Sequence, residues 1–211
     1  MNNIDLLAAA IGFGVLLISL TIHEAAHAWT ADKLGDPTAR RLGRVSLNPI
    51  VHIDWIGTVL LPIIAVISRF PLIGWAKPVP VDLRNLRHPR RDFMIVAAAG
   101  PISNFLQAFA AAALLRIVWD GTLGEEGPGV VVTFLFMAIQ VNLLLAFFNL
   151  IPVPPLDGGN VLLGLVPPGA AAVLDQLRQF GFVILYALML TGVAAALIMP
   201  PTNFLMRVLL P

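Results

Sequence analysis

Two histidines and a glutamate form the pattern H-E-x-x-H at the end of an apolar run that extends from Leu6 to Ile22. Residues four apart share one face of a helix, so His23 and His27 can direct two imidazoles at one ion. Glu24 is turned about 100° away around the helix, which suits a general base acting on a water beside the metal. The spacing predicts a zinc site. The alternative is a helix whose histidines merely hydrogen-bond to their neighbours.

A third protein ligand is needed, because two histidines alone do not complete a zinc site. The chain has no cysteine, so this ligand must be a histidine or a carboxylate. Asp157 is the candidate, since it lies two residues after a proline-rich stretch, 152–155, that must break the preceding helix. The alternative is that Asp157 only caps a helix through residues 160–166.

The composition is that of a membrane protein. Hydrophobic residues make up 58% and charged residues 12% of the chain, whereas soluble domains are about half apolar and about a quarter charged. The net charge of +1 gives no reason to invoke nucleic acid as a partner. The first apolar run is predicted to be a span rather than a signal peptide, because no Lys or Arg precedes it. The longest polar stretch, 77–92, is too short to fold alone, so residues 1–211 are predicted to be one membrane-embedded domain.

The apolar runs predict an all-α polytopic membrane protein with about four full transmembrane helices. We expect spans over residues 6–29, 93–119, 129–150 and 181–199, and a short surface helix over 167–179. The stretch 55–76 is interrupted by Pro62 and Pro71, so a re-entrant hairpin or a pair of short helices is expected there.

Charge predicts the orientation of the chain in the membrane. Segments 32–54 and 77–92 are rich in Lys and Arg, whereas the loop 120–127 is acidic. Because cytoplasmic loops carry the basic excess, both basic segments are placed in the cytoplasm and both termini outside. His23 and His27 then lie toward the cytoplasmic side.

A small membrane-associated strand is predicted for residues 74–81. Pro78 and Pro80 lack an N–H and blunt one edge. The other edge, which carries Lys77, Val79 and Val81, stays able to pair. An ordinary proline-rich loop is the alternative.

Three motifs occur in order: H-E-A-A-H at 23–27, G-P-I-S-N at 100–104 and N-L-I-P-V-P-P-L-D-G at 149–158. Together they resemble the site-2 protease family of intramembrane zinc metalloproteases, in the small bacterial and archaeal branch without a PDZ or CBS domain. The resemblance implies one Zn²⁺ per chain, with His23, His27 and Asp157 as ligands. It also implies that Glu24 is the general base.

The resemblance further implies roles for residues around the metal. Asn149 would shape the site, Gly100 and Asn104 would contact substrate, and the strand with Lys77 and Val79 would align it. Two further residues, His52 and Asp54, look like a pair specific to this branch, with either a metal-related or a structural role.

The function expected from the motifs is hydrolysis of peptide bonds in or near transmembrane segments of membrane protein substrates. The partners would be those substrates and the lipid bilayer of a bacterial or archaeal cytoplasmic membrane. A membrane metal transporter is one alternative, because intramembrane His and Asp residues also mark ion pathways. A catalytically silent homologue that binds membrane proteins is another.

Overall fold

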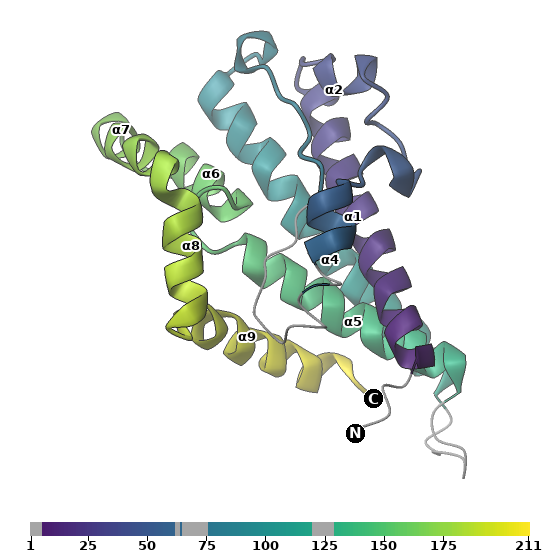
Figure 1. Ribbon diagram of the computed structural model, residues 1–211. Helices are drawn as coiled ribbons and strands as arrows, with labels where there is room; N and C mark the ends of the chain where they lie inside the picture. Colours follow the sequence, from purple (N-terminus) through teal and green to yellow (C-terminus); the bar gives the residue numbers. More distant parts are fainter. Residues whose placement is uncertain (1–5, 62–63, 65–75, 120–128) are drawn as a thin grey trace.

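The computed structural model describes residues 6–61, 64, 76–119 and 129–211, and every regular element in these ranges is helical (Figure 1). Three long helices form the centre: α1 (Leu6–Lys33), α4 (Pro89–Val118) and α5 (Val130–Asn149), each in contact with the other two. The shorter helices are α2 (Thr38–Arg41), α6 (Asp157–Leu165), α7 (Pro168–Leu177), α8 (Gly181–Leu190) and α9 (Val193–Leu209). Single 3₁₀ turns cover Pro49–Val51, Leu83–Asn85 and Arg178–Phe180, and a π-helical turn covers Trp55–Leu60.

Four segments are long and apolar enough to cross a membrane: Leu6–Lys33, Pro89–Val118, Val130–Asn149 and Pro168–Leu190. The predicted all-helical fold is thereby confirmed, and the number of candidate spans equals the four that were predicted. The last segment differs from the prediction, which placed it over 181–199. Gly192 adopts a left-handed φ of 78° that separates α8 from α9. A glycine has no Cβ and takes this conformation at no steric cost. Hydropathy does not reveal such a turn, so the predicted span continued past it.

The packing between α4 and α5 is made by small residues on one helix and larger ones on the other. Ala108 and Ala112 of α4 face Ile139 and Leu143 of α5 in one buried cluster. Small side chains let helix backbones approach closely in a membrane protein, where apolar burial alone gives little preference for one partner. Helix α9 also contacts α5, and its Leu205, Met206 and Leu209 pack against the same cluster.

The predicted strand over 74–81 does not form in the described part of that segment. Residues 76–82 run without regular structure, and Gly74 and Trp75 lie outside the described residues. The reason lies in the backbone of Lys77, which bonds to a loop instead of a strand. Its N–H donates to the His52 carbonyl at 2.9 Å, and its own carbonyl accepts from Arg44 Nη2. The predicted hairpin over 55–76 falls largely outside the described residues; its described start is the π-helical turn.

Both basic segments lie at the same end of the molecule, whereas the start of α1 and the end of α9 lie at the other (Figure 1). Asp36 ties the two segments together, with none of its surface exposed. Its carboxylate accepts from Thr38 N at 3.1 Å, Asp82 N at 2.7 Å and Asn85 Nδ2 at 2.9 Å. Burial raises the pKa of Asp36, but these hydrogen bonds outweigh burial and hold it below its ordinary value.

Replacing Asp36 by alanine should therefore lower the stability of the purified protein by about 3 kcal/mol, because buried donors lose their acceptor. The contribution of Asp36 is present above the ordinary carboxyl pKa and is lost as pH falls through the lowered folded-state value. Thermal unfolding in detergent at several pH values measures both effects. Asp175→Ala is the control, since this exposed side chain forms an ion pair with Arg178 on the protein surface. Equal losses of stability in the two variants would contradict the proposed role of Asp36 in joining the two basic segments.

Candidate metal centre

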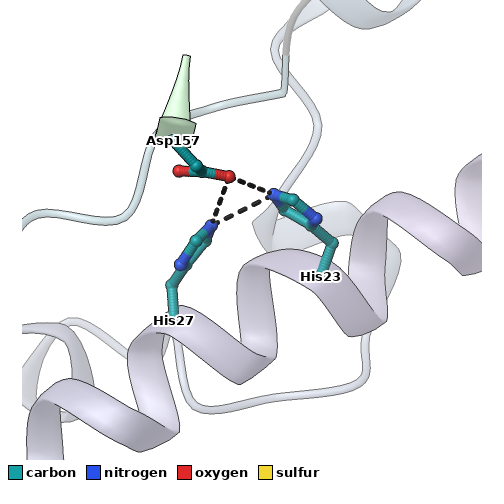
Figure 2. A group of neighbouring side chains, drawn as sticks. All are labelled: His23, His27 and Asp157. Atoms are coloured by element: carbon teal, nitrogen blue, oxygen red, sulfur yellow. Dashed lines mark hydrogen bonds and ion pairs between the residues drawn. The ribbon is translucent and has the colours of Figure 1, made fainter. Parts of the chain in front are cut away.

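Helix α1 carries His23 and His27 on one face, one turn apart, and their Nε2 atoms lie 3.0 Å from each other. The Oδ2 atom of Asp157, at the start of α6, lies 3.1 Å from His23 Nε2 and 3.3 Å from His27 Nε2 (Figure 2). The three side chains form a group whose ligand atoms lie close enough to hold one metal ion. The structure thus brings together the three residues predicted as ligands.

The break between α5 and α6 delivers Asp157 to the histidines. Prolines at 152, 154 and 155 prevent α5 from continuing past residue 149. Helix α6 then starts directly at Asp157, whose N-cap is Leu156 and has no side-chain bond. Asp157 is therefore not the cap of a helix, and its carboxylate points at the imidazoles instead. Gly158 allows this, since a Cβ there would collide with the Leu150 and Ile151 carbonyls.

The hydrogen bonds of the two imidazoles leave their Nε2 atoms facing the centre. His27 Nδ1 lies 2.7 Å from the Val96 carbonyl, which can only accept, so this nitrogen donates. His23 Nδ1 lies 2.6 Å from Asn104 Oδ1. Asp157 Oδ2 is buried, and no described residue donates a hydrogen bond to it. Two imidazole nitrogens and one carboxylate oxygen thus converge as acceptors, which fits a zinc ion and leaves it a fourth position.

Glu24 lies beside this group, with only 9% of its surface exposed. A cavity of about 430 Å³ opens next to it. Its wall combines the three metal-binding residues and Glu24 with mainly apolar side chains and with Asn149. Segment 76–81 contributes Ala76, Pro78, Val79 and Val81 to the same wall.

The remaining predicted site residues divide into those at the cavity and those away from it. Val79 lines the cavity, and so does Asn149, whose Nδ2 donates to the Leu145 carbonyl at 3.0 Å. Gly100 faces the imidazoles, because a Cβ there would overlap the Nε2 atoms of both histidines. Lys77 and Asn104 are not among the described residues that line this cavity.

Three residues near the site did not stand out in the sequence. Val96 contributes only a main-chain carbonyl, which no sequence pattern reveals. Asn142, a polar residue within an apolar span, bonds to Asn104, and polar groups at membrane depth are usually functional. Arg44 is buried and holds segment 76–82 through the Lys77 carbonyl.

His52 and Asp54 form local hydrogen bonds within their own loop. His52 Nε2 donates to the Ser46 carbonyl at 2.8 Å. Burial lowers the pKa of His52, so this side chain is neutral at neutral pH. Asp54 caps the π-helical turn by accepting from Ile56 N and Gly57 N.

A membrane-embedded helical chain with two histidines and an aspartate around a cavity defines a metal-dependent membrane protein, and the relatives of the chain define it further. A model of peptidase family M50 matches residues 121–191. The Bacillus subtilis protein named "Putative zinc metalloprotease YwhC" is 40% identical over 192 residues, which cover 89% of this chain and 84% of that protein. Two proteins named "Putative zinc metalloprotease Rip2" also match. The one from Mycolicibacterium smegmatis is 31% identical over 83% of this chain and 64% of its own length; the one from Mycobacterium tuberculosis is 30% identical over 82% and 64%.

The chain belongs to peptidase family M50, the site-2 protease family of zinc metalloproteases. The family resemblance seen in the three sequence motifs is thereby confirmed. No solved structure matches the chain.

Gly100→Ala should abolish zinc binding, because the added methyl group would occupy the space of the two Nε2 atoms. Zinc content of the purified protein, measured after dialysis against a fixed zinc concentration, tests this. Gly14→Ala is the matched control, since no atom lies within 4 Å of the position its Cβ would take. Full zinc occupancy in Gly100→Ala would show that the centre lies elsewhere.

Proposed function

We propose that this chain is an intramembrane zinc metalloprotease that hydrolyses peptide bonds in or beside the transmembrane segments of membrane proteins. One observation carries the proposal. His23, His27 and Asp157 converge beside Glu24 at the wall of a single cavity. Three of the helices that line this cavity, α1, α4 and α5, are long and apolar enough to cross a bilayer.

The metal and Glu24 have different roles in the proposed reaction. His23, His27 and Asp157 would hold one Zn²⁺, which would polarise the substrate carbonyl and make a water molecule more acidic. Glu24 accepts a proton from the attacking water and passes it to the leaving amine. The carboxylate of Glu24 lies in the cavity wall, where it meets water and substrate together.

The substrate must be extended before it can be cut, because a helix engages its own carbonyls and N–H groups. Segment 76–81 lines the cavity and replaces those lost bonds. Among the described residues, the N–H groups of Val79 and Val81 have no acceptor, so both are available to a substrate strand. Lys77 has a different task from Val79, since its N–H and carbonyl are already bonded to His52 and Arg44. It anchors the segment.

The basic end of the molecule faces the cytoplasm in this proposal. Positive charge accumulates on the cytoplasmic side of membrane proteins, and segments 32–54 and 77–92 lie together at one end (Figure 1). Segment 76–81, which lines the cavity, overlaps the start of the second of these basic segments. Water therefore reaches the zinc from the cytoplasmic side of the cell membrane.

A metal transporter would need further ligands along a path to both faces of the membrane. Within residues 6–61, 64, 76–119 and 129–211, His23, His27 and Asp157 form the one cluster of three metal-binding side chains. A silent homologue would be expected to lack the base, and Glu24 is present at the cavity. Both observations favour the protease.

Glu24→Gln should reduce cleavage of a tagged single-span substrate by about a hundredfold or more, because the proton acceptor is lost. Zinc content should stay at one equivalent, since Glu24 is not among the three predicted ligands. Gel analysis of co-expressed substrate gives the first result, and metal analysis of the purified protein gives the second.

Asp175→Asn is the control, because it makes the same carboxylate-to-amide change at an exposed position on α7. Undiminished cleavage by zinc-loaded Glu24→Gln would refute the mechanism. Zinc flux into proteoliposomes that survives this substitution would favour transport instead.

Arg44→Gln should raise KM for a transmembrane substrate more than it lowers kcat, because the pairing segment loses its hold on the Lys77 carbonyl. A loss of about tenfold in kcat/KM is expected, as for other small displacements of binding groups. Arg41→Gln makes the same charge change at an exposed residue three positions earlier, at the end of α2, and serves as the control. A fall confined to kcat would contradict the positioning role.

A further inference from the structure

A chain of hydrogen bonds leads from the metal centre into the apolar interior. His23 Nδ1 lies 2.6 Å from Asn104 Oδ1 on α4. Asn104 Nδ2 donates to Asn142 Oδ1 on α5 at 2.8 Å, and Asn142 Nδ2 donates to Ser19 Oγ on α1 at 2.9 Å. All four side chains are buried. We refer to Asn104 and Asn142 as the asparagine relay.

The direction of every bond in the relay follows from a main-chain carbonyl. The Asn142 amide group also lies 2.9 Å from the Ala138 carbonyl, which can only accept. The Asn142 atom that faces Ala138 is therefore its NH₂ group, and its oxygen must face Asn104. Asn104 must then present its own NH₂ group to Asn142 and its oxygen to His23. An oxygen there accepts, so the proton of His23 sits on Nδ1.

This placement decides whether His23 can bind a metal. With the proton on Nδ1, the Nε2 atom that faces His27 and Asp157 carries a free lone pair. Without an oriented acceptor at Nδ1, the proton is free to move to Nε2 and block the metal. His27 is different, because its Nδ1 acceptor is the main-chain carbonyl of Val96, which no side-chain substitution removes.

Asn104 is badly placed for substrate contact. None of its surface is exposed, and both polar atoms of its amide are already bonded within the relay. In the low dielectric of the interior, breaking either bond would leave a buried polar group unpaired. The amide is therefore held in one orientation.

We propose that Asn104 and Asn142 are positioning residues that fix the Nδ1–H tautomer of His23 and thereby raise the affinity of the centre for zinc. The inference rests on the proposed function for the identity of the metal. It goes beyond that function because it assigns control of the His23 tautomer to two residues that do not themselves bind the metal. Partners of metal-bound histidines commonly change metal affinity about 10-fold to 100-fold.

The test uses the full chain in detergent and the variant Asn142→Leu, which removes the partner of Asn104 without touching a ligand. Zinc affinity, measured by competition with a chromophoric chelator, should fall about tenfold. Asn142→Ala should also lower the zinc affinity, and this variant provides the test if the larger leucine prevents folding. Ser19→Ala should leave the affinity unchanged, because the Ala138 carbonyl still orients Asn142.

Thr21→Val is the matched control for loss of a buried hydrogen-bonding group. Its hydroxyl lies two residues from Ser19 on the same helix and donates only to the Leu17 carbonyl at 2.7 Å. Zinc affinity should be unchanged in this variant. Thermal unfolding of the metal-free proteins separates a general loss of stability from a loss of affinity.

Nitrogen-15 NMR of the imidazoles in the metal-free protein reads the tautomer directly, and the chain has only four histidines to assign. His23 should be Nδ1–H in the wild type and a mixture in Asn142→Leu, whereas His27 should stay Nδ1–H in both. Wild-type affinity and an unchanged His23 tautomer in the folded Asn142 variants would overturn the proposal while the protease assignment stands. Failure of the wild type to bind zinc would overturn both.

Discussion

The structure depends on one constraint: three acceptor atoms must be held together inside a membrane-embedded protein. Two imidazole nitrogens and a carboxylate oxygen approach within 3.0–3.3 Å, with no described residue donating to the carboxylate oxygen. Such a group is costly in an apolar interior unless a cation joins it. The surrounding elements are arranged to make that cation site possible. Helix α1 supplies two of the candidate ligands, the segment after the proline-rich break supplies the third, and Gly100 leaves the space.

The helices that surround the centre serve both packing and chemistry. Helix α4 packs through alanines against α5 and also presents Gly100, Asn104 and the Val96 carbonyl to α1. These helices must therefore approach closely for two reasons. Their packing stabilises the fold, and it places the groups of α4 that contact the two histidines. Polar residues in the spans are few, and those at the centre are bonded to one another across three helices. This arrangement satisfies their hydrogen bonds without water.

The cavity is lined both by the candidate reacting groups and by the segment proposed to present substrate. Glu24, the three candidate ligands and residues of segment 76–81 all belong to its wall. That segment lacks a strand partner within the described residues, and the loop at 44–52 holds only its beginning. In the proposed mechanism, a substrate strand that pairs with this segment would lie next to the zinc.

The sequence by itself determined the local features of this protein. The four-residue spacing of His23 and His27 places them on one helical face, and long apolar runs determine the spans, because both depend on residues close in the chain. The tertiary structure decided the rest. It brought Asp157 to the histidines from far along the chain, buried Asn104 behind His23 and engaged Lys77 with a loop while leaving Val79 at the cavity. These outcomes depend on which helices pack together, and the spacing of residues along the chain does not determine that.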